Sequence, residues 1–164
     1  MDIPTFDSQW VVWLHKSTDS NWGINSYLKL LSISNMQNFW EFLNNIYMID
    51  PKIYHIFIMR DTIEPRWEDP RNENGSTCSI KDNISNYTSI IESITIHVVG
   101  ETLLTDNSTV NGFSLNSKDN WFIVKILTSG KKNIINEIPL KIKNLSKTMT
   151  MQHKVNKIDK INKK

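Results

Sequence analysis

Two tryptophans of this chain stand in polar stretches, where a residue of the hydrophobic core is not expected. Trp22 closes the run STDSNW, and Trp67 lies within the run DTIEPRWED, with charged residues on both sides. Two indole rings that face each other could clamp a flat ring, and a cationic ring would gain about 0.5–2 kcal/mol of cation–π attraction from each face. Burial in the core, where most Trp side chains lie, is the alternative for both residues.

A carboxylate follows the second of these tryptophans directly. Glu68 could accept two N–H bonds from one edge of a planar ligand, as carboxylates do from other paired donors. A ligand that suits the two indoles and this acid is planar, positively charged and rich in N–H donors along one edge. A methylated guanine has all three properties, and the residues therefore predict a site for that base.

Further acids in the same loop raise the alternative of an enzyme. Glu64, Glu68 and Asp69 fall within one six-residue stretch, and no second, distant acid stands out as a glycoside hydrolase would require. The four His residues lack metal-ligand spacing, and no GxSxG, P-loop or GxGxxG motif occurs. The sequence therefore predicts a binding protein, not an enzyme, with no catalytic residue, no metal and no cofactor.

Length and composition predict one globular domain. The 164 residues are enough to bury a core, and the net charge of +2 means that any nucleic-acid contact must come from a local cluster. One cysteine excludes a disulfide framework. The N-terminus resembles no signal peptide and no apolar run has the length of a membrane span, so we expect a cytoplasmic protein without membrane contact. We expect the domain over 1–153 and a basic, disordered tail over 154–164.

The strands that carry these residues follow from the hydrophobic pattern. Strands are predicted over 8–16, 27–33, 53–59, 78–81, 109–116, 121–128 and 148–154. Trp10, Trp13 and Trp121 lie in such strands, and we expect them in the core. Because several strands follow one another directly, the pattern favours an α+β fold in which an antiparallel sheet carries helices on one face.

Helices are predicted where apolar residues recur every three or four positions, over 34–46, 82–101 and 133–145. Ser34 or Asn35 is the expected N-cap of the first helix. The second segment is rich in β-branched residues, which argues for a strand, but the sustained spacing favours a helix. Pro139 is expected to kink the third helix.

Several runs together resemble the mRNA cap-binding translation initiation factor 4E family. DTIEPRWED is similar to the family signature DGIEPMWED, and SQWVVWLHKSTDSNW carries three Trp in the order of the family's opening. NFWEFLNNI resembles the family's first helix, and VVGE resembles the end of its second. VNGFSLNSKDNWFIV resembles its phosphate-binding hairpin. The resemblance runs from about Trp10 to Thr128.

The resemblance implies a ligand and a place for it. Trp22 and Trp67 would stack on 7-methylguanine, and Glu68 would accept hydrogen bonds from the N1 and N2 groups of the guanine. The sheet would be curved, with about three helices packed on its convex face and the cap pocket on the concave side. The ligand would be the 7-methylguanosine triphosphate of capped mRNA, and no cofactor is implied.

A partner surface is also implied by the resemblance. Trp40 would lie on the opposite, dorsal surface, where the family receives a helical Tyr-x-x-x-x-Leu-hydrophobic peptide from a scaffold protein or from its competitors. Met36, one turn earlier, could extend that groove. A core position in the helix is the alternative for Trp40.

The basic residues depart from the family, which places Arg and Lys in the hairpin to hold the cap triphosphate. Lys118 stands where one family Arg would fall, whereas Thr77 and Asn120 take the positions of two other basic residues. The candidates for triphosphate binding are Lys118, Lys125, Lys131 and Lys132, with Lys118 and Lys125 expected as neighbours across the hairpin. A solvated basic face is the alternative.

The sequence as a whole predicts a monomer that binds capped mRNA and recruits it for translation initiation. A cap-binding translational repressor and a carbohydrate-binding module with exposed Trp platforms are the alternatives. The shortened, Lys-, Asn- and Ile-rich chain suits an AT-rich coding genome, such as that of a large DNA virus or a protist.

Overall fold

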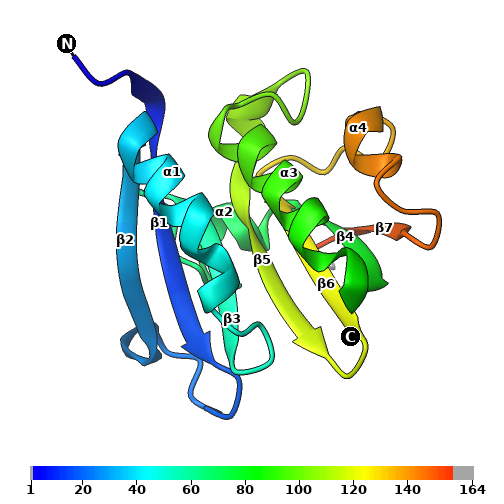
Figure 1. Cartoon of the computed structure of the whole chain (residues 1–164), viewed down its shortest axis with the longest axis horizontal. Helices are drawn as coiled ribbons and strands as arrows, with labels where there is room; N and C mark the ends of the chain where they lie inside the picture. The colour runs from blue at the N-terminus through cyan, green and yellow to red at the C-terminus, as the bar shows by residue number, and fades with distance from the viewer. Residues whose placement is uncertain (1, 157–164) are drawn as a thin grey trace, which may run out of the picture.

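The structure, a computed structural model, describes residues 2–156. In this part of the chain seven strands form one antiparallel sheet in the order β2-β1-β3-β5-β6-β4-β7 (Figure 1). The strands are β1 Thr5–Lys16, β2 Tyr27–Asn35, β3 Tyr54–Arg60, β4 Ser76–Asn83, β5 Val110–Lys118, β6 Trp121–Thr128 and β7 Thr150–Val155. The α-helices are α1 Met36–Asn45, α2 Pro70–Glu73, α3 Tyr87–Val99 and α4 Leu140–Lys143, and short 3-10 turns are η1 Ile24–Ser26, η2 Ile46–Met48, η3 Ile84–Asn86 and η4 Asn107–Thr109.

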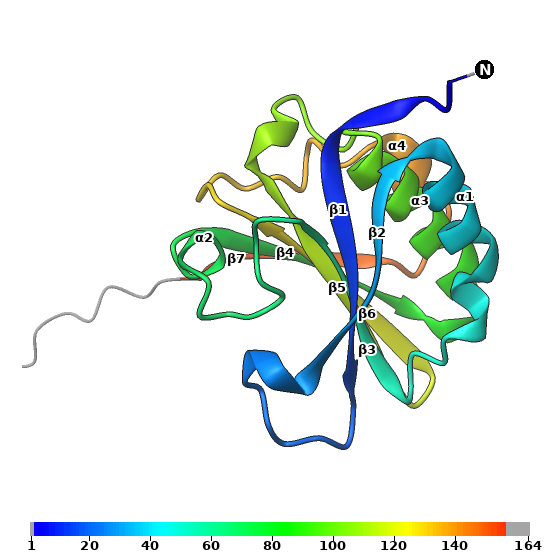
Figure 2. The same ribbon diagram turned by 90° about the vertical axis from the view of Figure 1, so that its left-hand side faces the viewer.

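The helices α1, α3 and α4 cover one face of the curved sheet, and the short α2 lies on the other side (Figures 1 and 2). The predicted fold class, an antiparallel sheet with about three helices on its convex face, is confirmed. The opposite, concave face is left without a helical layer, which makes it the place where a ligand could reach the sheet.

The core lies between the convex face and the helices. Alternate strand residues point into it, and the largest fully buried side chains include Trp10, Ile58, Ile80, Phe113 and Phe122. Full burial of one such aliphatic or aromatic side chain stabilises the fold by about 1.5–3 kcal/mol. Because side chains alternate along a strand, the residues between these positions face the concave side.

Helix α1 begins at an N-cap that its sequence predicts. The side chain of Asn35 accepts a hydrogen bond from the backbone N–H of Asn38 at 2.9 Å. Phe39, Phe42 and Leu43 on one face of the helix are buried. Segment 82–101 is helical over Tyr87–Val99, so the three-to-four-residue spacing outweighed its β-branched content.

The helix predicted over 133–145 is wrong in extent. Only Leu140–Lys143 is helical, and Pro139 precedes this helix as its N-cap instead of kinking it. Proline lacks a backbone N–H and fits where a helix starts, because the first N–H groups have no partner there. The apolar spacing reports burial all the same, since Ile134, Ile138 and Ile142 all lie in the core.

The three strand tryptophans differ in burial. Trp10 is fully buried, as expected of a core residue. Trp13 is only half-buried and packs against the smaller cluster of Phe57, Met59 and Ile63, and Trp121 is 42% exposed. The core prediction for Trp121 is wrong because its position in β6 has the parity of Lys125, which points to the concave face.

The sheet extends slightly past the expected domain end at residue 153. Lys154 and Val155 belong to β7, and Asn156 is buried. Residues 157–164 of the predicted tail lie outside the described residues. Among residues 2–156, no helix has the length and apolar content of a membrane span.

Candidate ligand-binding pocket on the concave face

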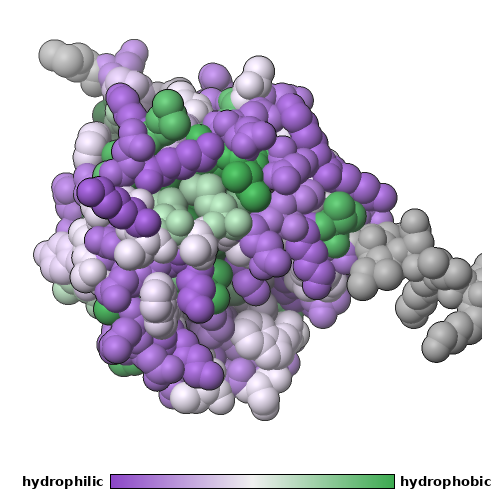
Figure 3. Space-filling view, turned by 90° about the vertical axis from the view of Figure 1, so that its right-hand side faces the viewer, coloured by the Kyte–Doolittle hydropathy of each residue, from purple (hydrophilic) through white to green (hydrophobic). Residues whose placement is uncertain are grey.

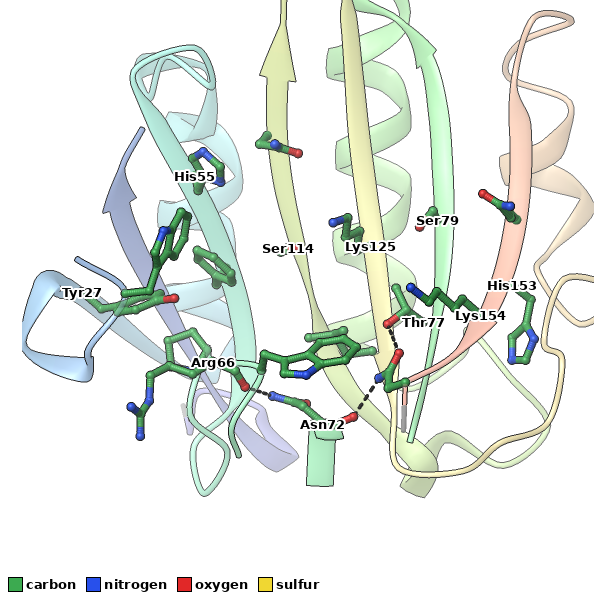
Figure 4. A pocket seen from close by; sticks show the side chains of 18 residues that line it. Tyr27, His55, Arg66, Asn72, Thr77, Ser79, Ser114, Lys125, His153 and Lys154 are labelled. Carbon is green, nitrogen blue, oxygen red and sulfur yellow. Dashed lines mark hydrogen bonds between the residues drawn. The ribbon is translucent and has the colours of Figure 1, made fainter. Parts of the chain in front are cut away.

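A pocket of ≈ 490 Å³ opens on the concave face. The residues that line it come from β2 (Tyr27), β3 (His55, Phe57), β5 (Ser114, Asn116), β6 (Lys125, Leu127), β4 (Thr77, Ser79), β7 with the following residue (Gln152, His153, Lys154, Asn156), α2 (Asn72) and two loops (Trp22, Pro65, Arg66, Trp67). Figure 4 shows two sides, one carrying Tyr27 and His55 and the other carrying Lys125, Ser79 and Lys154. The pocket therefore joins an aromatic wall to a polar, cationic wall.

The two tryptophans singled out from the sequence both line this pocket. Trp22 is 45% exposed and Trp67 is 49% exposed, so the core interpretation is wrong for both. Trp22 lies in the loop after β1 and Trp67 in the loop after β3, which places the two indoles on separate segments of the pocket wall. No ring contact joins them among the described residues, whereas Trp22 contacts His15, Tyr27 and His55.

The loop that carries Trp67 is built on a buried aspartate. The Asp69 carboxylate accepts hydrogen bonds from the backbone N–H groups of Glu64 and Arg71, both at 3.0 Å, and forms an ion pair with the Arg71 guanidinium at 3.0 Å. Burial by itself would raise the pKa of Asp69, but these hydrogen bonds hold the pKa below its usual value. Asp69 thus stays charged and fixes the turn, while its neighbours point outward.

Asn72 holds the same loop from beneath. Its fully buried amide donates to the carbonyls of Glu64 at 3.1 Å and Arg66 at 2.8 Å. The amide of Asn156 donates to the Asn72 carbonyl at 2.7 Å, and Thr77 donates to Asn156, also at 2.7 Å (Figure 4). This network joins the loop to β4 and to the residue after β7, and it fixes the backbone that carries Trp67.

Of the three acids within residues 64–69, Glu68 alone has no partner in the described part of the chain. Glu64 forms an ion pair with Arg66 at 2.6 Å and Asp69 with Arg71, whereas Glu68 is exposed and has no hydrogen-bond or ion-pair partner among residues 2–156. Glu68 is not among the lining residues of the empty pocket. Burial raises the pKa of Tyr27 to about 12, and the charge of Glu68 contributes to that rise, so the carboxylate lies near the aromatic wall.

The pocket lining is positively charged. It includes Arg66, Lys125 and Lys154 and no Asp or Glu among the described residues. Lys154 stands opposite Thr77 in the β4–β7 register, next to the position where the sequence lacks an expected cation. Sequence reasoning missed Lys154, because its strand could not be located beside β4 from local pattern alone.

The other lysines named from the sequence lie elsewhere. Lys118 pairs with Trp121 in the hairpin and Lys125 pairs with Ser114, so the two lysines are not cross-strand neighbours as predicted. Lys118 and Lys131 are exposed and do not line the pocket. Lys132 forms an ion pair with Glu137 at 2.6 Å and lines a separate hollow of ≈ 240 Å³.

The dorsal candidates lie on helix α1, on the convex side. Trp40 is 46% exposed and Met36 is 38% exposed, so the core alternative for Trp40 is wrong. Phe39 lies against the Trp40 ring at 5.2 Å between centroids and supports it from the core side.

Comparison with known proteins gives one family. The family model of Eukaryotic initiation factor 4E matches residues 5–164. A homolog from Acanthamoeba polyphaga mimivirus is 39% identical over 61 residues, which is 35% of this chain and 22% of the relative. Eukaryotic translation initiation factor 4E of Candida albicans is 29% identical over 135 residues, 74% of this chain and 63% of the relative. The matches thus cover less than two thirds of these curated relatives.

Solved structures agree with the fold. A complex of C. elegans eIF4E-3 with the 4E-binding protein Mextli and cap analog matches with a TM-score of 0.75 at 15% identity, over 94% of this chain and 93% of that one. Ascaris suum eIF4E-3 with m7G cap matches with a TM-score of 0.73 at 14% identity, over 98% and 96%.

Proposed function

This chain belongs to the eukaryotic initiation factor 4E family, and we propose that its concave pocket binds the 7-methylguanosine cap of mRNA. The methylated base stacks on Trp22 and Trp67, and Glu68 accepts hydrogen bonds from its N1 and N2 groups. The observation that carries this proposal is the unpaired acid. Among the three acids of residues 64–69, Glu68 alone is left without an internal partner in the described part of the chain, and it directly follows a half-exposed Trp that lines the pocket.

Charge favours a methylated base over an unmethylated one. A cationic ring gains attraction from each indole face, and the unpaired carboxylate of Glu68 adds a charge of the opposite sign. The two structural neighbours are complexes with a cap analog and with m7G cap, which supports the same ligand class for this pocket. The function is therefore one of binding rather than catalysis.

We assign the phosphates of the cap to the cationic wall. Lys125 and Lys154 both line the pocket, on β6 and β7 respectively. Lys118 lies on the same face beside the turn of the hairpin, where it could meet phosphates farther from the base. Lys131 and Lys132 have no place in this assignment, because neither lines the pocket and Lys132 is already paired.

The role in translation initiation includes a protein partner. Trp40 and Met36 offer an exposed apolar pair on α1 to a helical Tyr-x-x-x-x-Leu-hydrophobic peptide of a scaffold protein. The neighbour from C. elegans is a complex with a 4E-binding protein, which supports a protein partner for this chain. A monomeric, cytoplasmic protein would suffice for this role, and a repressor would use the same two surfaces.

Retention on immobilised ligand tests the proposal. The protein should bind a 7-methylguanosine triphosphate resin, and free 7-methylguanosine triphosphate should elute it while the same concentration of GTP does not. A polysaccharide resin is the control for a carbohydrate-binding module. Retention on the polysaccharide but not on the cap resin would favour that alternative and reject the cap.

A further inference from the structure

The exposed indole of Trp121 is not used by the site described above. Trp121 opens β6, four residues before Lys125, and the two side chains share the concave face because residues along a strand alternate. Four residues of strand span about 13 Å. A 42% exposed Trp therefore lies beside the pocket, beyond its cationic wall.

Two lysines flank this indole. The ammonium of Lys81 on β4 lies 5.0 Å from the centroid of the Trp121 ring, and Lys118 is the cross-strand partner of Trp121 on β5. Both lysines are exposed, and neither forms an ion pair within the described part of the chain. The nearest acid in sequence is Asp119 in the hairpin turn, so the group carries a net positive charge.

Packing in the core does not explain why Trp121 lies between two lysines. Asp82, next to Lys81, is fully buried on the opposite face of the sheet, so its carboxylate does not pair with Lys81. The side of the molecule that carries the β7 edge is mainly hydrophilic, with small hydrophobic areas (Figure 3). An exposed aromatic ring between cations is instead the arrangement that binds single-stranded nucleic acid, because bases stack on the ring and phosphates approach the lysines.

We propose that Trp121, Lys81 and Lys118 form a second site, which binds the ribonucleotides that follow the cap in the same RNA. The first base stacks on the free face of Trp121, and Lys81 and Lys118 neutralise the phosphates that lead to it. This inference rests on the proposed function, since the cap in the pocket would deliver the RNA chain to the hairpin. Lys125, which lines the pocket, lies on the same strand as Trp121, whereas Lys154 stands opposite Thr77, toward the other end of β4 from Lys81.

The affinities for two ligands, one of which reaches only the pocket, test this second site separately from the pocket. The full chain is titrated with 7-methylguanosine triphosphate and with a capped five-nucleotide RNA. The unmodified protein should bind the capped RNA more tightly. Trp121→Ala should lower affinity for the capped RNA roughly five- to a hundred-fold, as expected when one base loses an aromatic partner. Its affinity for 7-methylguanosine triphosphate should stay within about twofold.

Charge and aromaticity are tested separately. Lys81→Ala should flatten the dependence of log affinity on log salt by about 0.7 for each phosphate that the lysine had neutralised, for capped RNA only. Trp121→Phe should retain most of the capped-RNA affinity, whereas Trp121→Leu, which is apolar but cannot stack, should lose it. If Trp121→Ala fails to fold, the comparison of Trp121→Phe with Trp121→Leu still tests whether a base stacks at this position. Tyr47→Ala, which truncates a 68% exposed aromatic residue in the turn after α1, is the matched control.

The outcomes are distinct. If all Trp121 variants bind capped RNA as the unmodified protein does, the second site is rejected while cap binding stands. If Trp121→Leu binds like Trp121→Phe, the ring serves as an apolar surface and base stacking is rejected. If the unmodified protein does not bind 7-methylguanosine triphosphate, the proposed function fails. Binding of uncapped RNA that disappears in Trp121→Ala would then still support the nucleotide site.

Discussion

The imidazole of His15 lies parallel to the indole of Trp22, with ring centroids 4.0 Å apart and planes inclined by 13°. His15 is fully buried, and its Nε2–H donates to the carbonyl of Asn21 at 2.7 Å. One face of Trp22 is thereby occupied by the protein, and this contact fixes the orientation of the indole. A ligand ring can stack only on the other face.

A second histidine at this indole predicts that cap affinity depends on pH. His55 contacts Trp22 edge to face at 5.5 Å, and its pKa is lowered by burial and then by the charges of His15 and Lys125. Protonation of His55 would put a positive charge against Trp22, on which a cationic base must stack. Because the pKa of His55 lies below the ordinary value of 6.5, this histidine is neutral above that pH and gains its charge only below it.

We therefore expect affinity for 7-methylguanosine triphosphate to fall as the pH is lowered below about 6.5. His55→Phe keeps a ring at the edge of Trp22 without a titrating group, so this variant should lose less affinity between pH 7 and pH 5. Titrations monitored by tryptophan fluorescence at several pH values give the two profiles. Superimposable profiles would show that the charge of His55 has no effect on the site.

The role of Glu68 can be tested without changing its shape. Glu68→Gln replaces a charged acceptor by a neutral amide and presents an NH2 group to the guanine donors. Hydrogen bonds to charged groups contribute about 1.5–3 kcal/mol, so affinity should fall at least roughly tenfold. Thermal unfolding should not change, because Glu68 is exposed and has no partner among residues 2–156.

Glu64→Gln is the matched control for this experiment. It lies in the same loop, but its carboxylate is bound to Arg66 and the contact is only partly buried, so the variant should keep most of its cap affinity. Equal losses in both variants would mean that the loop as a whole, and not the Glu68 carboxylate, determines affinity.

The cationic wall predicts a difference between cap ligands of different charge. Lys154→Ala should weaken binding of 7-methylguanosine triphosphate and leave binding of the 7-methylguanosine nucleoside nearly unchanged, because Lys154 would meet only phosphates. Lys acts as a point charge without the two-pronged geometry of Arg, so the effect should shrink as salt rises. Lys132→Ala serves as the control, since Lys132 is paired with Glu137 outside the pocket. A nucleoside affinity that falls equally would place Lys154 in the support of the base pocket instead.

Peptide binding at the dorsal surface should be lost without loss of cap binding. Trp40→Ala should abolish capture of a Tyr-x-x-x-x-Leu-hydrophobic peptide, because a helix docked in a groove depends on few anchors. Retention on the cap resin should persist, since Trp40 lies on the helical side of the sheet. Peptide capture that survives in a folded Trp40→Ala protein would move the partner site elsewhere.

Local pattern was sufficient for most of the fold. The N-cap at Asn35 and the apolar spacing of α3 are short-range signals, and the structure confirms both. The helix prediction for segment 133–145 was wrong because the spacing there reports only which residues are buried. A chain with a proline in the middle can bury Ile134, Ile138 and Ile142 without forming one helix.

The site was predictable only in part. Trp22 and Trp67 stood out because they lie in polar runs, but nothing local indicated that Asn72 supports the loop. Its contact with Asn156 joins residues 84 positions apart, which no window of sequence contains. The alternation of side chains along a strand shows that the strand has two faces, but it does not show which face the helices cover. The exposure of Trp121 was missed for this reason.

Discrimination between the methylated and the unmethylated base is the sharpest test of cap binding by this pocket. The protein is titrated with 7-methylguanosine triphosphate and with GTP, with tryptophan fluorescence as the readout. Methylation makes the ring cationic, and attraction of about 0.5–2 kcal/mol from each indole face predicts an affinity for the methylated ligand at least roughly fivefold higher, with strong quenching. Equal affinity for the two ligands would reject cap binding by Trp22 and Trp67, because stacking on these indoles requires the cationic ligand to bind more tightly.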